Sequence, residues 1–172
     1  DAAAILQARG SRASLVMLGG GVEVSRLKTR ALEMKLGNMV FLPPVPMSEV
    51  GTVLAAADVL LVHLRKDPLF EITIPSKTQA YMAVGKPLLM AVNGDAADLV
   101  RQARCGLTAE SENPKALADA VDALAAMPAV ELKTMGDSAS RFYQEVLGLQ
   151  VGASKFAAVF ESLSQKVRGA EQ

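Results

Sequence analysis

The chain has 172 residues, 18 basic and 18 acidic side chains, a formal net charge of zero and 51% hydrophobic residues. It is long enough for one domain with a sizeable core, and a share of only 4% aromatic residues points to an interior of Ala, Leu and Val, as in layered α/β proteins. Runs of basic residues are too short for nucleic-acid binding, and the single Cys105 excludes an internal disulfide and a cysteine metal cluster.

The sequence begins without methionine, in a segment at 1–9 that has the character of a helix and stops near Gly10. We therefore expect an excised lobe whose missing part includes the first strand of this lobe or of its partner. No apolar stretch approaches the roughly 18 residues that cross a bilayer, and no signal peptide is recognisable. Together with the lone cysteine, this predicts a cytoplasmic protein.

Strands and helices are predicted to alternate along the first 110 residues, which favours an α/β fold: a Rossmann-like, doubly wound parallel sheet. The strand at 15–18 is expected to be buried. Ser48 and Asp95 are predicted helix caps, and 63–73 is expected to be a loop. The predicted strands are 15–18, 39–42, 59–62, 88–92 and 106–108, and the predicted helices between them are 23–36, 48–57, 76–84 and 95–104.

Three further helices are predicted at 113–127, 131–147 and 151–167, the first of them beginning at Asn113-Pro114. No strand lies between them. They are therefore expected to pack on an outer face of the sheet or to cross towards a partner lobe.

The segment from Ile74 to Pro87 is predicted to be a short helix with clear signals at both ends. Ser76 and Gln79 have the spacing of a capping box, and Gly85 sits where a helix-ending glycine is expected. The helix N-terminus and the Lys77 ammonium suit an anion, above all a phosphate. The alternative is a capped crossover helix with a solvated lysine. The apolar run after it is typical of a strand covered on both faces.

In doubly wound sheets, ligands bind beyond the carboxyl ends of the strands, where several loops of this chain converge. The run Gly19-Gly20-Gly21 lets a backbone approach a ligand closely, although the residues alone favour a tight strand-to-helix turn. It is not a dinucleotide fingerprint, because Val24 stands where the last glycine is required. Prolines end the strand at Phe41-Leu42-Pro43-Pro44, so any recognition of a ligand there would use the main chain.

The loop after the strand at 59–62 carries several polar candidates. His63, the one histidine of the chain, could contact a phosphate or act as a pH-sensitive donor, although a lone histidine is more often structural. Arg65, Lys66 and Asp67 are typical of a solvated loop, but Arg65 or Lys66 could swing in to compensate a diphosphate.

Pro75-Ser76-Lys77 followed by Tyr81-Met82-Ala83-x-Gly85-Lys86-Pro87 resembles the donor-site segment of bacterial family 4 (group 1) glycosyltransferases, which have the two-lobed GT-B architecture. The similarity is greatest to the colanic-acid and O-antigen type and extends from about Leu15 to the end. It implies that 1–172 is the C-terminal lobe that binds a nucleotide sugar, without the acceptor lobe. It also places Gly19–Gly21, Ser76, Lys77 and Thr78 at the donor phosphates and the backbone of Leu42 and Pro43 at the nucleobase.

One departure from the family concerns the donor ribose. Many relatives carry two glutamates eight residues apart, the second on the central helix; here that slot is Ala80, and eight residues before it stands Ile72. Glu71 is one residue out of register. Gln79 could bond a ribose hydroxyl instead, or it could only complete the cap with Ser76. Relatives also carry a pair of basic residues in the first strand-to-helix loop of this lobe. This pair has no counterpart here, because that segment is expected to be absent.

The resemblance implies the donor half of a retaining glycosyltransferase that needs no metal and no cofactor. It would transfer a sugar from a nucleotide sugar, expected to be UDP-linked, to a lipid-linked saccharide during surface polysaccharide or lipopolysaccharide synthesis, at the inner face of the inner membrane. The isolated lobe would be inactive. Two alternatives remain: a nucleotide-binding oxidoreductase lobe, which lacks its glycine fingerprint here, and a non-catalytic α/β module, which Ala80 makes conceivable.

Overall fold

The fold consists of short parallel strands joined by helices. The structure is a computed structural model that describes residues 1–170, with side chains as far as residue 163. The strands are β1 (Leu15–Leu18), β2 (Met39–Leu42), β3 (Leu60–His63), β4 (Leu88–Ala91) and β5 (Gly106–Thr108). The helices are α1 (Ala2–Ala8), α2 (Val24–Glu33), α3 (Met47–Ala56), α4 (Pro68–Glu71), α5 (Ser76–Val84), α6 (Asp95–Ala103), α7 (Pro114–Ala126), α8 (Ala129–Phe142), the π-helical turn η1 (Tyr143–Leu147) and α9 (Leu149–Ala170).

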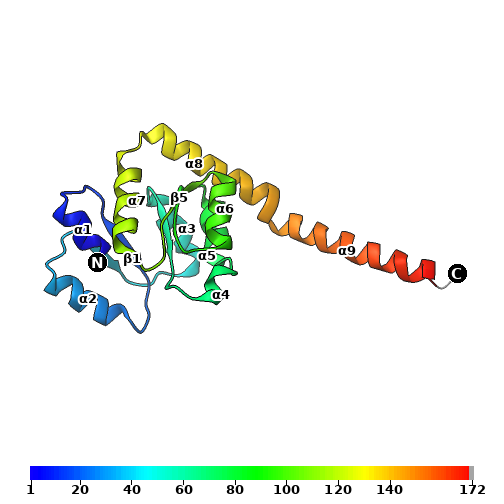
Figure 1. Cartoon of the computed structure of the whole chain (residues 1–172), viewed down its shortest axis with the longest axis horizontal. Helices are drawn as coiled ribbons and strands as arrows, with labels where there is room; N and C mark the ends of the chain where they lie inside the picture. The colour runs from blue at the N-terminus through cyan, green and yellow to red at the C-terminus, as the bar shows by residue number, and fades with distance from the viewer. Residues whose placement is uncertain (171–172) are drawn as a thin grey trace.

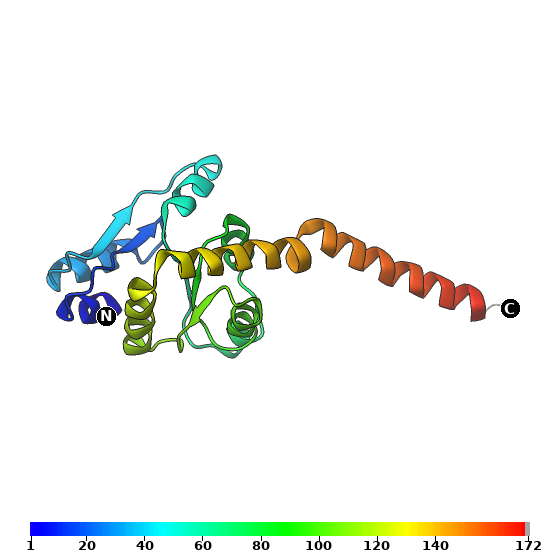
Figure 2. The ribbon, with the colours of Figure 1, turned by 90° about the horizontal axis from the view of Figure 1, so that it is seen from above.

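Every ladder between these strands is parallel, which confirms the predicted Rossmann-like α/β class. The strands form two sheets, β1-β2 and β3-β4-β5, and Figure 2 shows the β1-β2 pair to one side of the other three. Across a doubly wound sheet the strands lie in the order 3-2-1-4-5-6. The observed strands β1 to β5 correspond, in chain order, to strands 2 to 6 of that pattern. The place of its strand 1 therefore falls between β1 and β3. Among the described strands, β1 and β3 therefore each have an edge without a strand partner.

Strand β4 lies at the centre of the packing, because both of its faces are covered. Leu88, Met90 and Val92 belong to one apolar cluster, whereas Leu89 and Ala91 belong to a second. Successive side chains of a strand point to opposite faces, so the uninterrupted apolar run divides into two cores. Cys105 lies in the first core, where burial raises the pKa of its thiol to about 11.

Strand β1 is where the burial prediction was wrong. The strand is present over the predicted residues, but Val16 is 56% exposed and its ladder partner Val40 is 41% exposed. Helix α2 next to it is also poorly covered: its apolar residues Val24 and Leu27 are only half-buried, and no residue of this helix is fully buried. An apolar run indicates that a strand is stable when both of its faces are buried. Which elements pack on those faces depends on distant parts of the chain.

Several predicted helix ends shift by one residue. Ser48 and Asp95 do not cap their helices, because Pro46 and Gly94 occupy the capping positions and neither helix has a side-chain cap. The helix predicted to begin at Asn113-Pro114 begins at Pro114, and Asn113 caps it: its side-chain oxygen accepts a hydrogen bond of 2.9 Å from the N–H of Ala116. The strand predicted at 59–62 begins and ends one residue later.

The last three α-helices differ in the elements against which they pack. Helix α7 packs on α1, α8 packs on α5, and α9 extends away from the rest of the domain (Figure 1). The described part of α9 exposes a row of large apolar side chains: Leu149, Phe156, Val159, Phe160 and Leu163. The helical run Ala129–Leu163 contains an 18-residue window with a mean hydropathy of 1.2, so by length and composition alone it could cross a membrane, contrary to the expectation from the unbroken apolar stretches of the sequence.

The contact between α5 and α8 depends on two glycines. Gly85 ends α5 in the left-handed conformation, with φ of 74°, as predicted for this position. A Cβ atom added to Gly136 of α8 would collide with the carbonyl oxygen of Gly85. The missing side chain of Gly136 therefore lets α8 lie directly on the end of α5.

We predict that Gly136→Ala lowers the free energy of unfolding by about 1–3 kcal/mol, because two packed backbones must move apart. Urea unfolding followed by circular dichroism measures this. The matched control is Gly152→Ala in α9, where an added Cβ meets no atom within 4 Å. This control should be neutral or slightly stabilising, because alanine is the better helix former. Equal losses in both variants would contradict the packing argument.

Candidate functional site

The N-terminus of α5 is the first part of the predicted ligand site. The helix begins at Ser76, and Pro75, with an extended ψ of 136°, occupies the capping position. The predicted capping box of Ser76 and Gln79 is therefore wrong, and no side chain caps this helix. The N–H of Thr78 donates to the carbonyl of Pro75 at 2.8 Å, whereas the N–H groups of Ser76 and Lys77 have no acceptor within the helix.

The first-turn side chains of α5 differ in accessibility. Ser76, Lys77, Gln79 and Ala80 are exposed, so each is open to a ligand. Thr78 is completely buried, and its hydroxyl oxygen has no hydrogen-bond partner among the described residues. Of the three α5 residues predicted at the phosphates, Thr78 is thus the one whose side chain is closed to a ligand, and its N–H already donates to the Pro75 carbonyl.

His63 lies next to this helix end. It is the last residue of β3, opposite Ala91 in the ladder, and β3 packs against α5. Partial burial lowers the pKa of His63, and the positive charge of Lys77 lowers it further. The imidazole and the ammonium are therefore within electrostatic range of each other, at the edge where the carboxyl ends of β3 and β4 meet.

The segment predicted as a loop at 63–73 contains the short helix α4. Asp67 caps it by accepting a 2.9 Å hydrogen bond from the N–H of Leu69. Its last residue, Glu71, lies so close to Gly94 that a Cβ there would collide with the Glu71 carbonyl. This contact was not predicted from the sequence. Its signal is a glycine inside an Asn-Gly-Asp turn that directly follows a buried strand.

The glycine run Gly19–Gly21 lies beside the end of strand β2, which prolines follow. Both were predicted on the ligand side of the sheet. The N–H of Gly19 donates to the carbonyl of Leu42 at 3.2 Å, and Leu42 and Pro43 are exposed. Gly19 and Gly21 have φ of 119° and 152°, which side-chain-bearing residues rarely adopt. An added Cβ at any of the three glycines meets nothing within 4 Å, so it is conformation rather than crowding that requires Gly19 and Gly21, and neither requires Gly20.

The predicted residues thus form two groups on different sheets. One group lies around Gly19–Gly21 and Leu42, and the other joins His63 and Glu71 to the start of α5. Among the described residues, no hydrogen bond or ion pair connects the two groups. Lys66 is exposed in the loop that leads to α4, and the described side chains form no metal-ligand cluster of three or more His, Cys, Asp or Glu.

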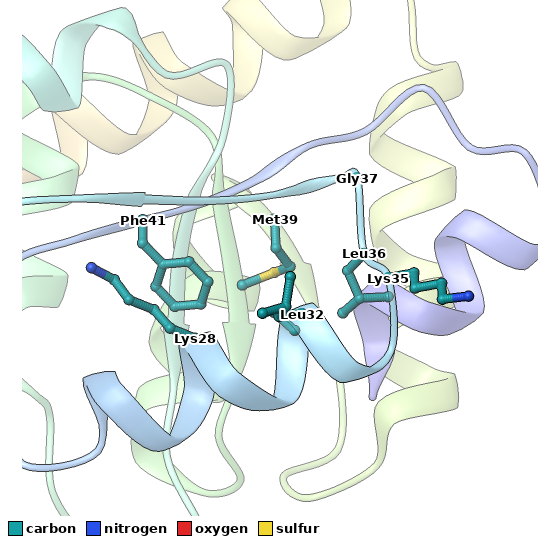
Figure 3. A pocket seen from close by; sticks show the side chains of 8 residues that line it. Lys28, Leu32, Lys35, Leu36, Gly37, Met39 and Phe41 are labelled. Atoms are coloured by element: carbon teal, nitrogen blue, oxygen red, sulfur yellow. The ribbon is translucent and has the colours of Figure 1, made fainter.

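A groove of about 550 Å³ lies outside both groups, between α2 and the edge strand β2. Figure 3 shows Leu32, Met39 and Phe41 along it, with Lys28 at one end and Lys35 at the other. The ammonium of Lys28 lies 6.0 Å from the centre of the Phe41 ring, at the outer limit of a cation–π contact. The predicted donor residues do not line this groove.

The fold and the position of these loops define a Rossmann-like α/β domain of the type found in GT-B glycosyltransferases. The chain belongs to the group 1 glycosyl transferases, whose family model matches residues 1–141. Among curated proteins, it is similar to the probable glycosyltransferase WbjE of Pseudomonas aeruginosa, with 27% identity over 162 residues, which are 93% of this chain and 40% of WbjE.

Solved structures show the same fold at low sequence identity. The sucrose-phosphate synthase of Thermosynechococcus elongatus superimposes with a TM-score of 0.78 and 20% identity, over 96% of this chain and 42% of that one. HepE of Anabaena in complex with UDP gives 0.75 and 16%, over 94% of this chain and 44% of that one. The chain therefore spans less than half the length of these proteins.

The wrong capping box changes what we expect of Ser76. Ser76→Ala should leave the free energy of unfolding within about 0.5 kcal/mol, because its hydroxyl makes no cap. Asn113→Ala should lose about 1 kcal/mol, because it removes an observed cap. Paired denaturation curves of the two variants check this. A larger loss for Ser76→Ala than for Asn113→Ala would restore the capping box.

Proposed function

We propose that this chain is the donor-binding domain of a retaining glycosyltransferase and that it binds the diphosphate of a UDP-linked sugar at the start of α5. The observation that carries the proposal is the exposed N-terminus of α5, with Lys77 in its first turn and His63 beside it. Membership of the family supports it, as does a similar fold in HepE, whose structures contain UDP and UDP-glucose.

The chemistry of this proposal concerns the leaving group. Transfer of the sugar leaves a diphosphate with additional negative charge, and a site that stabilises this charge accelerates the transfer. The free N–H groups of Ser76 and Lys77, the dipole of α5 and the Lys77 ammonium all present positive charge at one point. Lys77 gains nothing from the helix in this position, because a cation at a helix N-terminus slightly opposes the dipole.

The rest of the donor would extend towards the β1-β2 sheet. In this proposal Gly19–Gly21 lie along the phosphates, and main-chain groups near Leu42 and Pro43 recognise the base. Gln79 is exposed one residue before Ala80, so its amide is open to a ribose hydroxyl in place of the family's glutamate. Glu71 serves the site through its backbone contact with Gly94, and Lys66 through its charge.

The acceptor in this proposal is a lipid-linked saccharide used for a surface polysaccharide, met on the cytoplasmic side of a membrane. Support comes from the similar fold of WaaG, described as a glycosyltransferase involved in lipopolysaccharide biosynthesis. The chain spans 40% of WbjE, so we assign acceptor binding to a partner lobe. This chain alone should bind UDP weakly and transfer no sugar.

We predict that Lys77→Ala weakens UDP binding roughly tenfold to hundredfold, which corresponds to about 1.5–3 kcal/mol for a charge-assisted hydrogen bond. The melting temperature should stay nearly unchanged, because the removed charge does not favour the helix. Isothermal titration calorimetry at matched, moderate salt measures the affinity, since screening weakens the contribution of the lysine.

The matched control is Lys155→Ala, which removes an exposed lysine on α9. It should bind UDP as the parent does. NAD should bind no better than background if the oxidoreductase alternative is wrong. Unchanged UDP affinity in Lys77→Ala would show that α5 does not hold the phosphates.

A further inference from the structure

The residue that the family resemblance does not assign is His63, and its surroundings suggest a specific role. It ends β3 at the sheet edge where the candidate phosphate site lies, and it keeps part of its surface in water. The strand behind it is fixed, because Leu60 and Val62 are buried and β3 is bonded along its length to β4. The backbone of His63 therefore has a defined position at this edge, from which the exposed imidazole can reach the candidate site.

Resting on the proposed function, we infer that His63 is a proton-linked ligand of the donor diphosphate, neutral in the free domain and protonated when a nucleoside diphosphate occupies the start of α5. Two features of the structure place it in this role: β3 packs directly on α5, and His63 and Lys77 are within electrostatic range. The negative charge of an anion that binds Lys77 must therefore also act on the imidazole of His63.

The charges around His63 decide the sign of this linkage. Among the charged groups on the elements next to β3, Lys77 is the one that acts on His63, and it disfavours the imidazolium. The others nearby are Arg65, Lys66, Asp67 and Glu71 on the segment that follows β3, and Asp95, Asp98 and Arg101 on α6, which packs on β4. A bound diphosphate reverses the balance, because it neutralises Lys77 and adds a negative charge that favours the imidazolium.

This arrangement makes UDP binding dependent on pH. In the free domain the pKa of His63 lies below its ordinary value of 6.5, because of partial burial and then Lys77. With diphosphate bound the pKa is expected to rise. Binding between the two pKa values takes up a proton, so the affinity for UDP should increase as the pH falls through the higher value and level off below the lower one.

The chain offers a direct measurement, because it contains one histidine. The imidazole Cε1–H resonance can be followed by NMR over a pH series in the free protein and with saturating UDP, inorganic pyrophosphate or uridine. We expect the pKa to rise with UDP and with pyrophosphate and to stay unchanged with uridine. In Lys77→Met, the pKa of the free protein should rise, because the charge that lowers it is gone.

Calorimetry with His63→Gln tests the same inference through affinity. At pH 6 this variant should bind UDP about twofold to fivefold more weakly than the parent, as for an exposed ion pair, and at pH 8 equally well. The phosphate of UDP itself titrates near pH 6, so the variant and parent are compared at each pH, where the ligand's contribution cancels.

The outcomes separate the two proposals. If UDP binds and the His63 resonance titrates as in the free protein, this inference is overturned and the proposed function stands. If the resonance responds equally to uridine, His63 contacts the nucleoside rather than the diphosphate, and the inference is again overturned. If no UDP binding is detected at any pH, both proposals fall.

Discussion

The structure depends on one constraint: strand β4 must be covered on both faces. Its five-residue apolar run from Leu88 to Val92 is almost entirely removed from water, and neighbouring side chains belong to different cores. Cover on both faces requires helices on both sides of the sheet, which parallel strands joined by crossover helices provide. The same requirement brings the loops after β3 and β4 to one edge, where α5 begins. The candidate phosphate site is therefore a by-product of how this strand is buried.

The sequence was most informative where a local pattern has one physical solution. The strands, the left-handed Gly85 and the helix start at Asn113-Pro114 could be predicted, because each depends on residues close in sequence. It was less informative where two solutions compete. Ser76-x-x-Gln79 fits a capping box, but Pro75 already has the extended conformation of a capping position, which moves Ser76 into the helix. The exposure of Val16 and the contact of Gly94 with Glu71 depend on distant chain segments, which no local pattern encodes.

For the candidate site, the sequence indicated which residues lie at strand ends but not which of them meet. Gly19 and Leu42 share a hydrogen bond, and His63 and Lys77 share an electrostatic environment. Thr78 was predicted at the phosphates, but its side chain is completely buried and its N–H already donates to the Pro75 carbonyl. The lack of a glutamate at Ala80 shifts the expected donor contacts further towards main-chain groups. A site of this kind tolerates changes of side chain but depends closely on the conformation of its loops.

The edges of β1 and β3 have a consequence for handling this chain. Each strand has a side without a strand partner among the described residues, and Leu-Val-Met-Leu in β1 contains neither charge nor proline. Natural proteins usually protect such edges with lysines, prolines or bulges, because an open apolar edge is a template for another chain's strand. Solutions of this polypeptide by itself are therefore expected to lose material to strand-by-strand self-association as they are concentrated.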